Sequence, residues 1–147
     1  MSHKKKSALS IKNKKASHDF NLLEFLEVGI ILKGNEVKSI RQGKVQLKES
    51  FARIENNELW LHQCHITPYA QAHGFSKQDP VRPRKLLIHK KELKRWYGKI
   101  KEKGFTLVAT KMYLKGQYVK LEIALAKSKK LYDKRDQLKE KDIKRDI

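Results

Sequence analysis

Acidic residues are scarce in this 147-residue chain, which has 16 Asp and Glu against 35 Lys and Arg and a formal net charge of +19 at pH 7. Cysteine is nearly absent: Cys64 alone excludes an internal disulfide and fits a reducing compartment. No apolar run approaches the ~20 residues of a membrane-spanning helix, and no apolar stretch follows the basic N-terminus as in a secretory signal. We therefore expect a soluble, cytoplasmic protein of one domain with tails, monomeric when free.

Motifs of catalysis are missing too. The chain has no glycine-rich phosphate cradle, no nucleophile elbow and no paired zinc-binding cysteines, so we expect neither an enzyme nor a cofactor. His62, Cys64 and His65 form a cluster, but in a strand His65 points away from the other two, and no metal site is predicted. His18 beside Asp19 is interpreted as a strand-edge histidine that contacts backbone or RNA, in preference to half of an acid–base pair.

The positive charge gathers at the two ends of the sequence. Residues 1–15 contain six lysines and no acid, and a second basic segment begins at Lys127. Such an excess is relieved by a polyanion, and a phosphate backbone is the natural one. We expect a flexible arm over residues 1–14, a folded body over 15–127 and a basic tail over 128–147 that is disordered when free and helical on its target.

Apolar periodicity predicts a mainly β body. Alternation indicates a long strand over 18–32 and two closing strands over 106–114 and 118–125, the last with Val119, Leu121, Ile123 and Leu125 on its buried face. Asn56-Asn57-Glu58 is typical of a hairpin turn between 51–54 and 59–66. Five or six short strands fit a small, closed or nearly closed antiparallel barrel.

Helices are predicted in two places. A short one fits between Gly34 and Gly43, and a longer one carries Leu93, Trp96, Tyr97 and Ile100 as one apolar stripe that Gly104 ends. The three prolines fall between 68 and 83, which marks a long loop.

Two features indicate RNA contacts. The run Arg82-Pro83-Arg84-Lys85 is interpreted as a grip on phosphates or bases in preference to a solvated loop. Glu27 is an acid between apolar neighbours in a basic body. It either pairs with a neighbouring lysine or makes a specific contact, by accepting base hydrogens or positioning a lysine, and the sequence leaves both open.

Four segments in order resemble the SmpB (small protein B) family, bacterial proteins that bind transfer-messenger RNA (tmRNA, SsrA). They are residues 13–20 (NKKASHDF), 34–41 (GNEVKSIR), 84–88 (RKLLI) and 129–135 (KKLYDKR). The resemblance implies an oligonucleotide-binding-type (OB-like) β-barrel with two or three flanking helices. It further implies that the barrel grips the tRNA-like domain of tmRNA and delivers it to stalled ribosomes for rescue and tagging of incomplete proteins. The alternative is a general ribosomal or single-strand RNA-binding protein on an OB fold.

The expected sites follow from the basic run and the resemblance together. RNA-binding residues are predicted to be Asn13, Lys14, Lys15, His18, Glu27, Arg82, Arg84, Lys85, Leu87 and Lys120. Residues of the tail, which the resemblance places in the decoding centre and messenger channel of the ribosome, are Lys129, Lys130, Tyr132, Asp133, Lys134 and Arg135.

Overall fold

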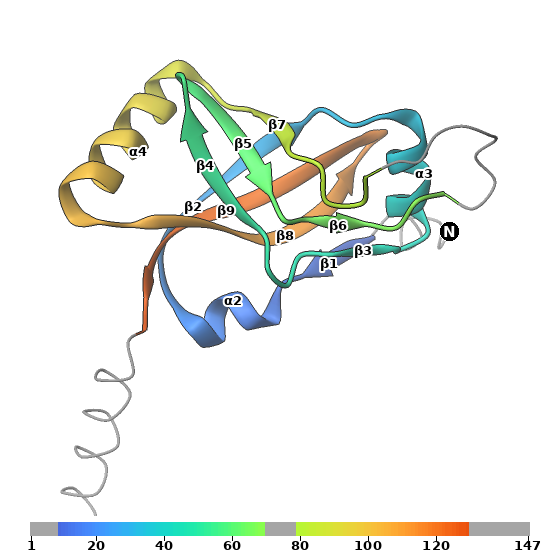
Figure 1. The fold of residues 1–147 in the computed structure, drawn as a ribbon, viewed down its shortest axis with the longest axis horizontal. Coiled ribbons are helices and arrows are strands. Elements are labelled where there is room, and N and C mark those ends of the chain that lie inside the picture. Colours follow the sequence, from blue (N-terminus) through green and yellow to red (C-terminus); the bar gives the residue numbers. More distant parts are fainter. Residues whose placement is uncertain (1–8, 70–78, 130–147) are drawn as a thin grey trace, which may run out of the picture.

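Six antiparallel strands close into a barrel (Figure 1). The computed structural model describes residues 9–69 and 79–129. Pairing runs in the order β8-β4-β5-β7-β2-β9, and β9 pairs back with β8. This ring confirms the mainly β prediction and is consistent with an OB-like fold. The barrel strands are β2 (Phe20–Ile30), β4 (Phe51–Glu55), β5 (Glu58–His62), β7 (Arg84–Leu87), β8 (Thr106–Lys115) and β9 (Tyr118–Ser128).

Two short additions lie on this frame. β1 (Ser10–Lys12) pairs with β8, and β3 (Val45–Gln46) pairs with β6 (His65–Ile66). The β4–β5 hairpin turns as predicted, because Asn56 and Asn57 both take the left-handed conformation, with φ of 51° and 63°.

Helices cover the barrel from three sides. Figure 1 shows α3 (Gly34–Arg41) and α4 (Lys90–Lys103) at opposite ends, while α2 (Lys14–Asp19) lies below the sheet. In α4, Trp96 is fully buried in the core and Gly104 ends the helix in the left-handed conformation, as predicted. Tyr97 departs from the predicted stripe, because it lies at the side of the helix and is 45% exposed.

The N-terminal part differs from the prediction. Residues 10–14 are not a flexible arm, because β1 pairs with the edge of β8 and α2 begins at Lys14. Ala16 of α2 packs on Val108, Ala124 and Ala126, so the outer face of β9 is covered there. The long strand accordingly begins at Phe20, and His18 lies in a helix.

The core fills the barrel interior with inward residues of every strand. Val119, Leu121, Ile123 and Leu125 of β9 are all buried in it, as the alternation predicted. None of the helices among residues 9–69 and 79–129 has the length and apolar character that a membrane crossing requires.

Candidate nucleic-acid interface

The outer face of β7, β2, β9, β8 and β1 carries two rows of side chains. Residues opposite one another in neighbouring strands share a face. Register therefore aligns one row of Leu87, Gly29, Lys120, Tyr113 and Ser10, and a second row of Glu27, Glu122, Lys111 and Lys12. This surface, with Lys115 beside it, is called the outer sheet face below.

Lysines and an aromatic ring alternate along β8 on this face. The ammonium of Lys111 lies 5.4 Å from the ring centroid of Tyr113, and Lys115 follows two residues later. Cations suit phosphates, and an aromatic ring such as that of the half-buried Tyr113 suits an unstacked base. The surface can therefore hold both parts of a nucleotide.

A groove crosses the first row at its β7 end. It has a volume of about 440 Å³ and is lined by Leu26, Glu27, Gly29, Leu87, Ile88, His89, Glu92 and Lys120. Three residues predicted to contact RNA, Glu27, Leu87 and Lys120, are thus brought together from three strands. Leu87 is 53% exposed, an unusual state for a leucine on a barrel, and offers an apolar wall to a base.

Carboxylates make this groove a poor phosphate site. Glu27 and Glu92 repel phosphate, whereas a carboxylate accepts hydrogen bonds from base amino and imino groups. The groove is therefore suited to a base, while the lysines of the second row and Lys115 are suited to the backbone beside it.

Glu27 is held in place by neighbours on β8. The hydroxyl of Tyr113 donates to Glu27 Oε1, and Lys115 Nζ lies 3.4 Å from Oε2. The hydrogen bond from Tyr113 and the nearby Lys115 lower the pKa of Glu27, so the carboxylate is charged at neutral pH. Of the two possibilities that the sequence left open, the structure shows the pair with a lysine. Each carboxylate oxygen has a further lone pair that can accept a hydrogen bond.

Gly29 fixes the position of Leu87. A Cβ on Gly29 would come within 3.3 Å of both Cβ and Cδ1 of Leu87, which is tighter than ordinary contact. A larger residue at position 29 would therefore force Leu87 to shift by a few tenths of an ångström.

The predicted arginine grip is wrong for Arg84. Its side chain is buried, 1% exposed, and donates from Nε to Glu36 Oε2 at 2.7 Å and from Nη1 to the Cys64 carbonyl at 2.7 Å. Arg82 binds the same carboxylate, with Nη2 2.6 Å from Oε1. The two arginines hold α3 to the barrel and are not a free cationic surface.

Glu36 is charged despite its burial. Burial alone would raise its pKa, but hydrogen bonds from Arg82, the Lys33 backbone N–H and Arg84 outweigh burial, and the pKa lies below its ordinary value. This pair could not be predicted from the sequence, because Glu36 lies 48 residues before Arg84.

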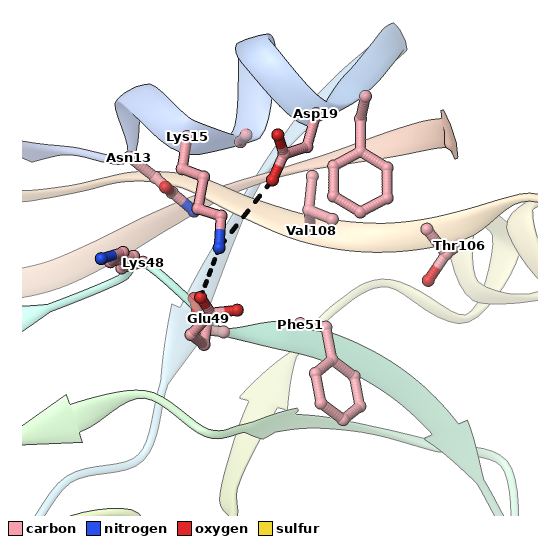
Figure 2. A pocket seen from close by; sticks show the side chains of 11 residues that line it. Asn13, Lys15, Asp19, Lys48, Glu49, Phe51, Thr106 and Val108 are labelled. Atoms are coloured by element: carbon pink, nitrogen blue, oxygen red, sulfur yellow. Dashed lines mark hydrogen bonds and ion pairs between the residues drawn. The ribbon is translucent and has the colours of Figure 1, made fainter. Parts of the chain in front are cut away.

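Other predicted cations are partly occupied. Lys85 Nζ lies 2.9 Å from Glu58 Oε2 with 38% of its side chain exposed. Figure 2 shows Lys15 reaching from α2 to Glu49, at 2.6 Å, with Asp19 at 3.9 Å, across a pocket of about 320 Å³. Because Lys15 and Lys48 face Asp19 and Glu49 there, this pocket has balanced charge and suits a phosphate less than the outer sheet face does.

Asn13 has a structural role. It is 8% exposed, and its Nδ2 donates to the carbonyls of Leu47 and Ala109 at 2.9 and 2.8 Å. The side chain joins β1 to the barrel and is buried, so Asn13, predicted to bind RNA, has no exposed side chain to do so. Lys14, next to it, is exposed.

The remaining predicted residues lie at the end of α2. His18 is exposed, with Nδ1 2.9 Å from Asp19 Oδ1. Lys129, expected in the tail, hydrogen-bonds through its backbone N–H to the Asp19 carbonyl at 2.9 Å and through Nζ to the Ser17 carbonyl at 3.3 Å. Lys130, Tyr132, Asp133, Lys134 and Arg135 lie outside the described residues.

His62, Cys64 and His65 lie in the part of the chain that the structure describes. There, no three His, Cys, Asp or Glu side chains gather as metal ligands would. His62 lies 2.9 Å from Glu55 Oε2, and burial raises the pKa of the Cys64 thiol to about 12, so it stays protonated.

Four residues of the candidate interface were not predicted from the sequence. Gly29 and Tyr113 support Leu87 and Glu27, and Lys111 and Lys115 flank Tyr113. One signal was present: Lys111, Tyr113 and Lys115 alternate, which places them on one face of a strand.

A closed β-barrel with a cationic, aromatic-bearing outer face and a base-sized groove defines an RNA-binding barrel protein. A family model described as SmpB protein matches residues 10–147. The chain belongs to the SmpB family.

Relatives agree with this assignment. The SsrA-binding protein of Carboxydothermus hydrogenoformans is 57% identical over 92% of this chain and 90% of its own length. That of Bacillus cytotoxicus is 52% identical over 92% of this chain and 86% of its own length. A solved structure described as "tmRNA-SmpB: a journey to the center of the bacterial ribosome" contains a chain 47% identical to this one, with a TM-score of 0.68 over 83% of this chain and 85% of that one.

Proposed function

We propose that this chain is a tmRNA-binding adaptor of trans-translation. Its barrel binds the tRNA-like domain of tmRNA, and the complex enters stalled ribosomes so that incomplete proteins are tagged and released. The relatives named SsrA-binding protein and the tmRNA–SmpB structure support this role. The protein acts in the cytoplasm as a monomeric binding protein without catalytic activity.

The observation that carries the proposal is the groove of Glu27, Leu87 and Lys120. A folded RNA presents unstacked bases in its loops, and proteins read such bases by stacking and by hydrogen bonds to their edges. Leu87 supplies the apolar wall, Glu27 an acceptor and Lys120 a cation. The surrounding lysines add affinity that does not depend on sequence.

Leu87→Glu should weaken binding of the tRNA-like RNA about 10- to 100-fold, because burying a leucine side chain against a base contributes at most ~1.5–3 kcal/mol. The new carboxylate also repels the phosphates nearby. Stability should change little, because Leu87 is 53% exposed. Equilibrium binding of the labelled RNA and thermal unfolding measure the two effects.

Ile31→Glu is the matched control. Ile31 is 48% exposed and does not line the groove, and its replacement by Glu adds the same charge. It should weaken binding only by the general electrostatic effect of one added acid. Equal losses in the two variants would contradict the groove as the binding site.

The alternative, a general single-strand RNA-binding protein, has one observation in its favour. Phe25 and Tyr118 are 51% and 64% exposed, as base-stacking rings of such proteins are. A surface that stacks any base needs no groove, so the groove of Glu27, Leu87 and Lys120 favours the first proposal.

A further inference from the structure

A second cationic surface lies on α4. Lys91, Lys94, Gly98 and Lys101 follow one another at intervals of three, four and three residues, so they form one stripe along the helix, about 15 Å long. This set is called the α4 stripe. Its opposite side carries Trp96, which is fully buried, with Leu93 and Ile100 packed against the core.

The lysines of the stripe are available for a ligand. No carboxylate among the described residues pairs with Lys91 or Lys94, and both are exposed. Lys101 Nζ lies 5.4 Å from the ring centroid of Tyr97, which is 45% exposed. In the same helix Arg95 and Lys99 are already bound to Glu24 of β2, with Lys99 Nζ 3.0 Å from Oε1.

Gly98 has no packing reason to be a glycine. A Cβ there would meet only Oε1 of Glu102, at 4.0 Å, within the described part of the chain. Glycine inside a helix is less stable than alanine. A glycine between two lysines leaves the helix backbone open to close approach by a partner. Because Gly98 has no packing role, close approach is the use that remains for it.

The α4 stripe lies on a different side of the helix from the residues that reach β2. Arg95 and Lys99 form the side of α4 that reaches β2, and each residue lies about 100° around the helix from the one before it. Lys94 and Gly98 are therefore turned about a quarter of the circumference away from that side. The stripe is therefore a surface of α4 distinct from the one that meets β2.

We propose that the α4 stripe binds the phosphate backbone of a second RNA, ribosomal RNA, while the outer sheet face holds the first. This rests on the proposed function, which brings the protein and its RNA to the ribosome. Charge complementarity selects a polyanion. A membrane surface would need several bulky apolar side chains on the exposed side, whereas Trp96, Leu93 and Ile100 of α4 face the core and only Tyr97 of its large hydrophobic side chains is exposed.

The test uses the full chain with Lys94→Glu and Lys101→Glu together. Affinity of the protein for ribosomes should fall at least about tenfold, and the slope of log affinity against log salt should decrease by about two. Affinity for the isolated tRNA-like RNA should match that of a control with the same charge change, Arg41→Glu with Lys44→Glu. These control residues are exposed at the α3 end of the barrel.

Gly98→Gln tests close approach without altering charge. It should leave the unfolding temperature equal or higher and lower ribosome affinity several-fold. The inference is overturned by equal ribosome losses in the α4 and control variants, by an unchanged salt slope, or by full affinity of Gly98→Gln. Selective loss of tRNA-like RNA binding in the α4 variant would likewise contradict it. Absence of measurable binding between the unaltered protein and the tRNA-like RNA would instead refute the proposed function.

Discussion

Deletion of residues 130–147 should abolish ribosome rescue while the affinity for the tRNA-like RNA stays within about threefold. The deleted segment has seven Lys and Arg against five Asp and Glu, so only two of the 19 net positive charges are lost. Such a small change weakens binding to a phosphate backbone little. Tagging of a stalled nascent chain in a reconstituted translation system measures rescue, and equilibrium binding measures RNA affinity.

The deletion starts at residue 130 because the structure moves the boundary of the body. β9 pairs with β2 as far as Ser128, and Lys129 hydrogen-bonds to the end of α2. Removal from Ser128 would cut these bonds and confuse tail function with barrel stability.

A chain with residues 130–147 in scrambled order controls for charge and length. It should also fail in rescue if the KKLYDKR segment makes specific contacts in the decoding centre. Rescue by the deletion variant, or a lower unfolding temperature of its barrel, would contradict the assignment of a separate tail function.

Arg84→Met should destabilise the barrel by about 3–5 kcal/mol, the usual cost of leaving one partner of a buried ion pair without the other. Glu36 would keep Arg82 but lose the buried donor, and the Cys64 carbonyl would lose its hydrogen bond from Arg84, while the Pro80 carbonyl would keep the one from the Ile66 N–H. Unfolding by urea, followed by circular dichroism, gives the free energy of unfolding.

Arg82→Met is the matched control for the same carboxylate. Arg82 is 25% exposed, so water can replace part of its contact with Glu36, and the loss of stability should be clearly smaller. Below its unfolding transition, Arg84→Met should bind RNA as the parent does. A folded Arg84→Met variant with weakened RNA binding would restore the grip that the sequence suggested.

Periodicity carried the successful part of the sequence analysis. The alternation in β9 and the stripe around Trp96 are local, and burial follows from them directly. The α2 helix escaped prediction because its six residues, mostly polar, bury only Ala16. Its stability comes from packing on distant strands, which propensity does not reveal.

Long-range pairing explains what was missed at the site. Arg84 looks like a surface cation in the sequence because its partner, Glu36, lies on a different element. Glu27, Leu87 and Lys120 were expected from family resemblance, and their meeting in one groove depends on the barrel register that sets Gly29 between Leu87 and Lys120. Spacing in the chain holds no information on that register.

The central claim is that the barrel recognises a folded, tRNA-shaped RNA and not any single strand. Competition for the bound protein between a tRNA-like RNA and an unstructured oligonucleotide of equal length tests it most directly. The tRNA-like RNA should displace the labelled ligand at a concentration at least about a hundredfold lower, as specific binding exceeds non-specific binding by more than that in comparable complexes. Equal displacement by the two RNAs would contradict the account.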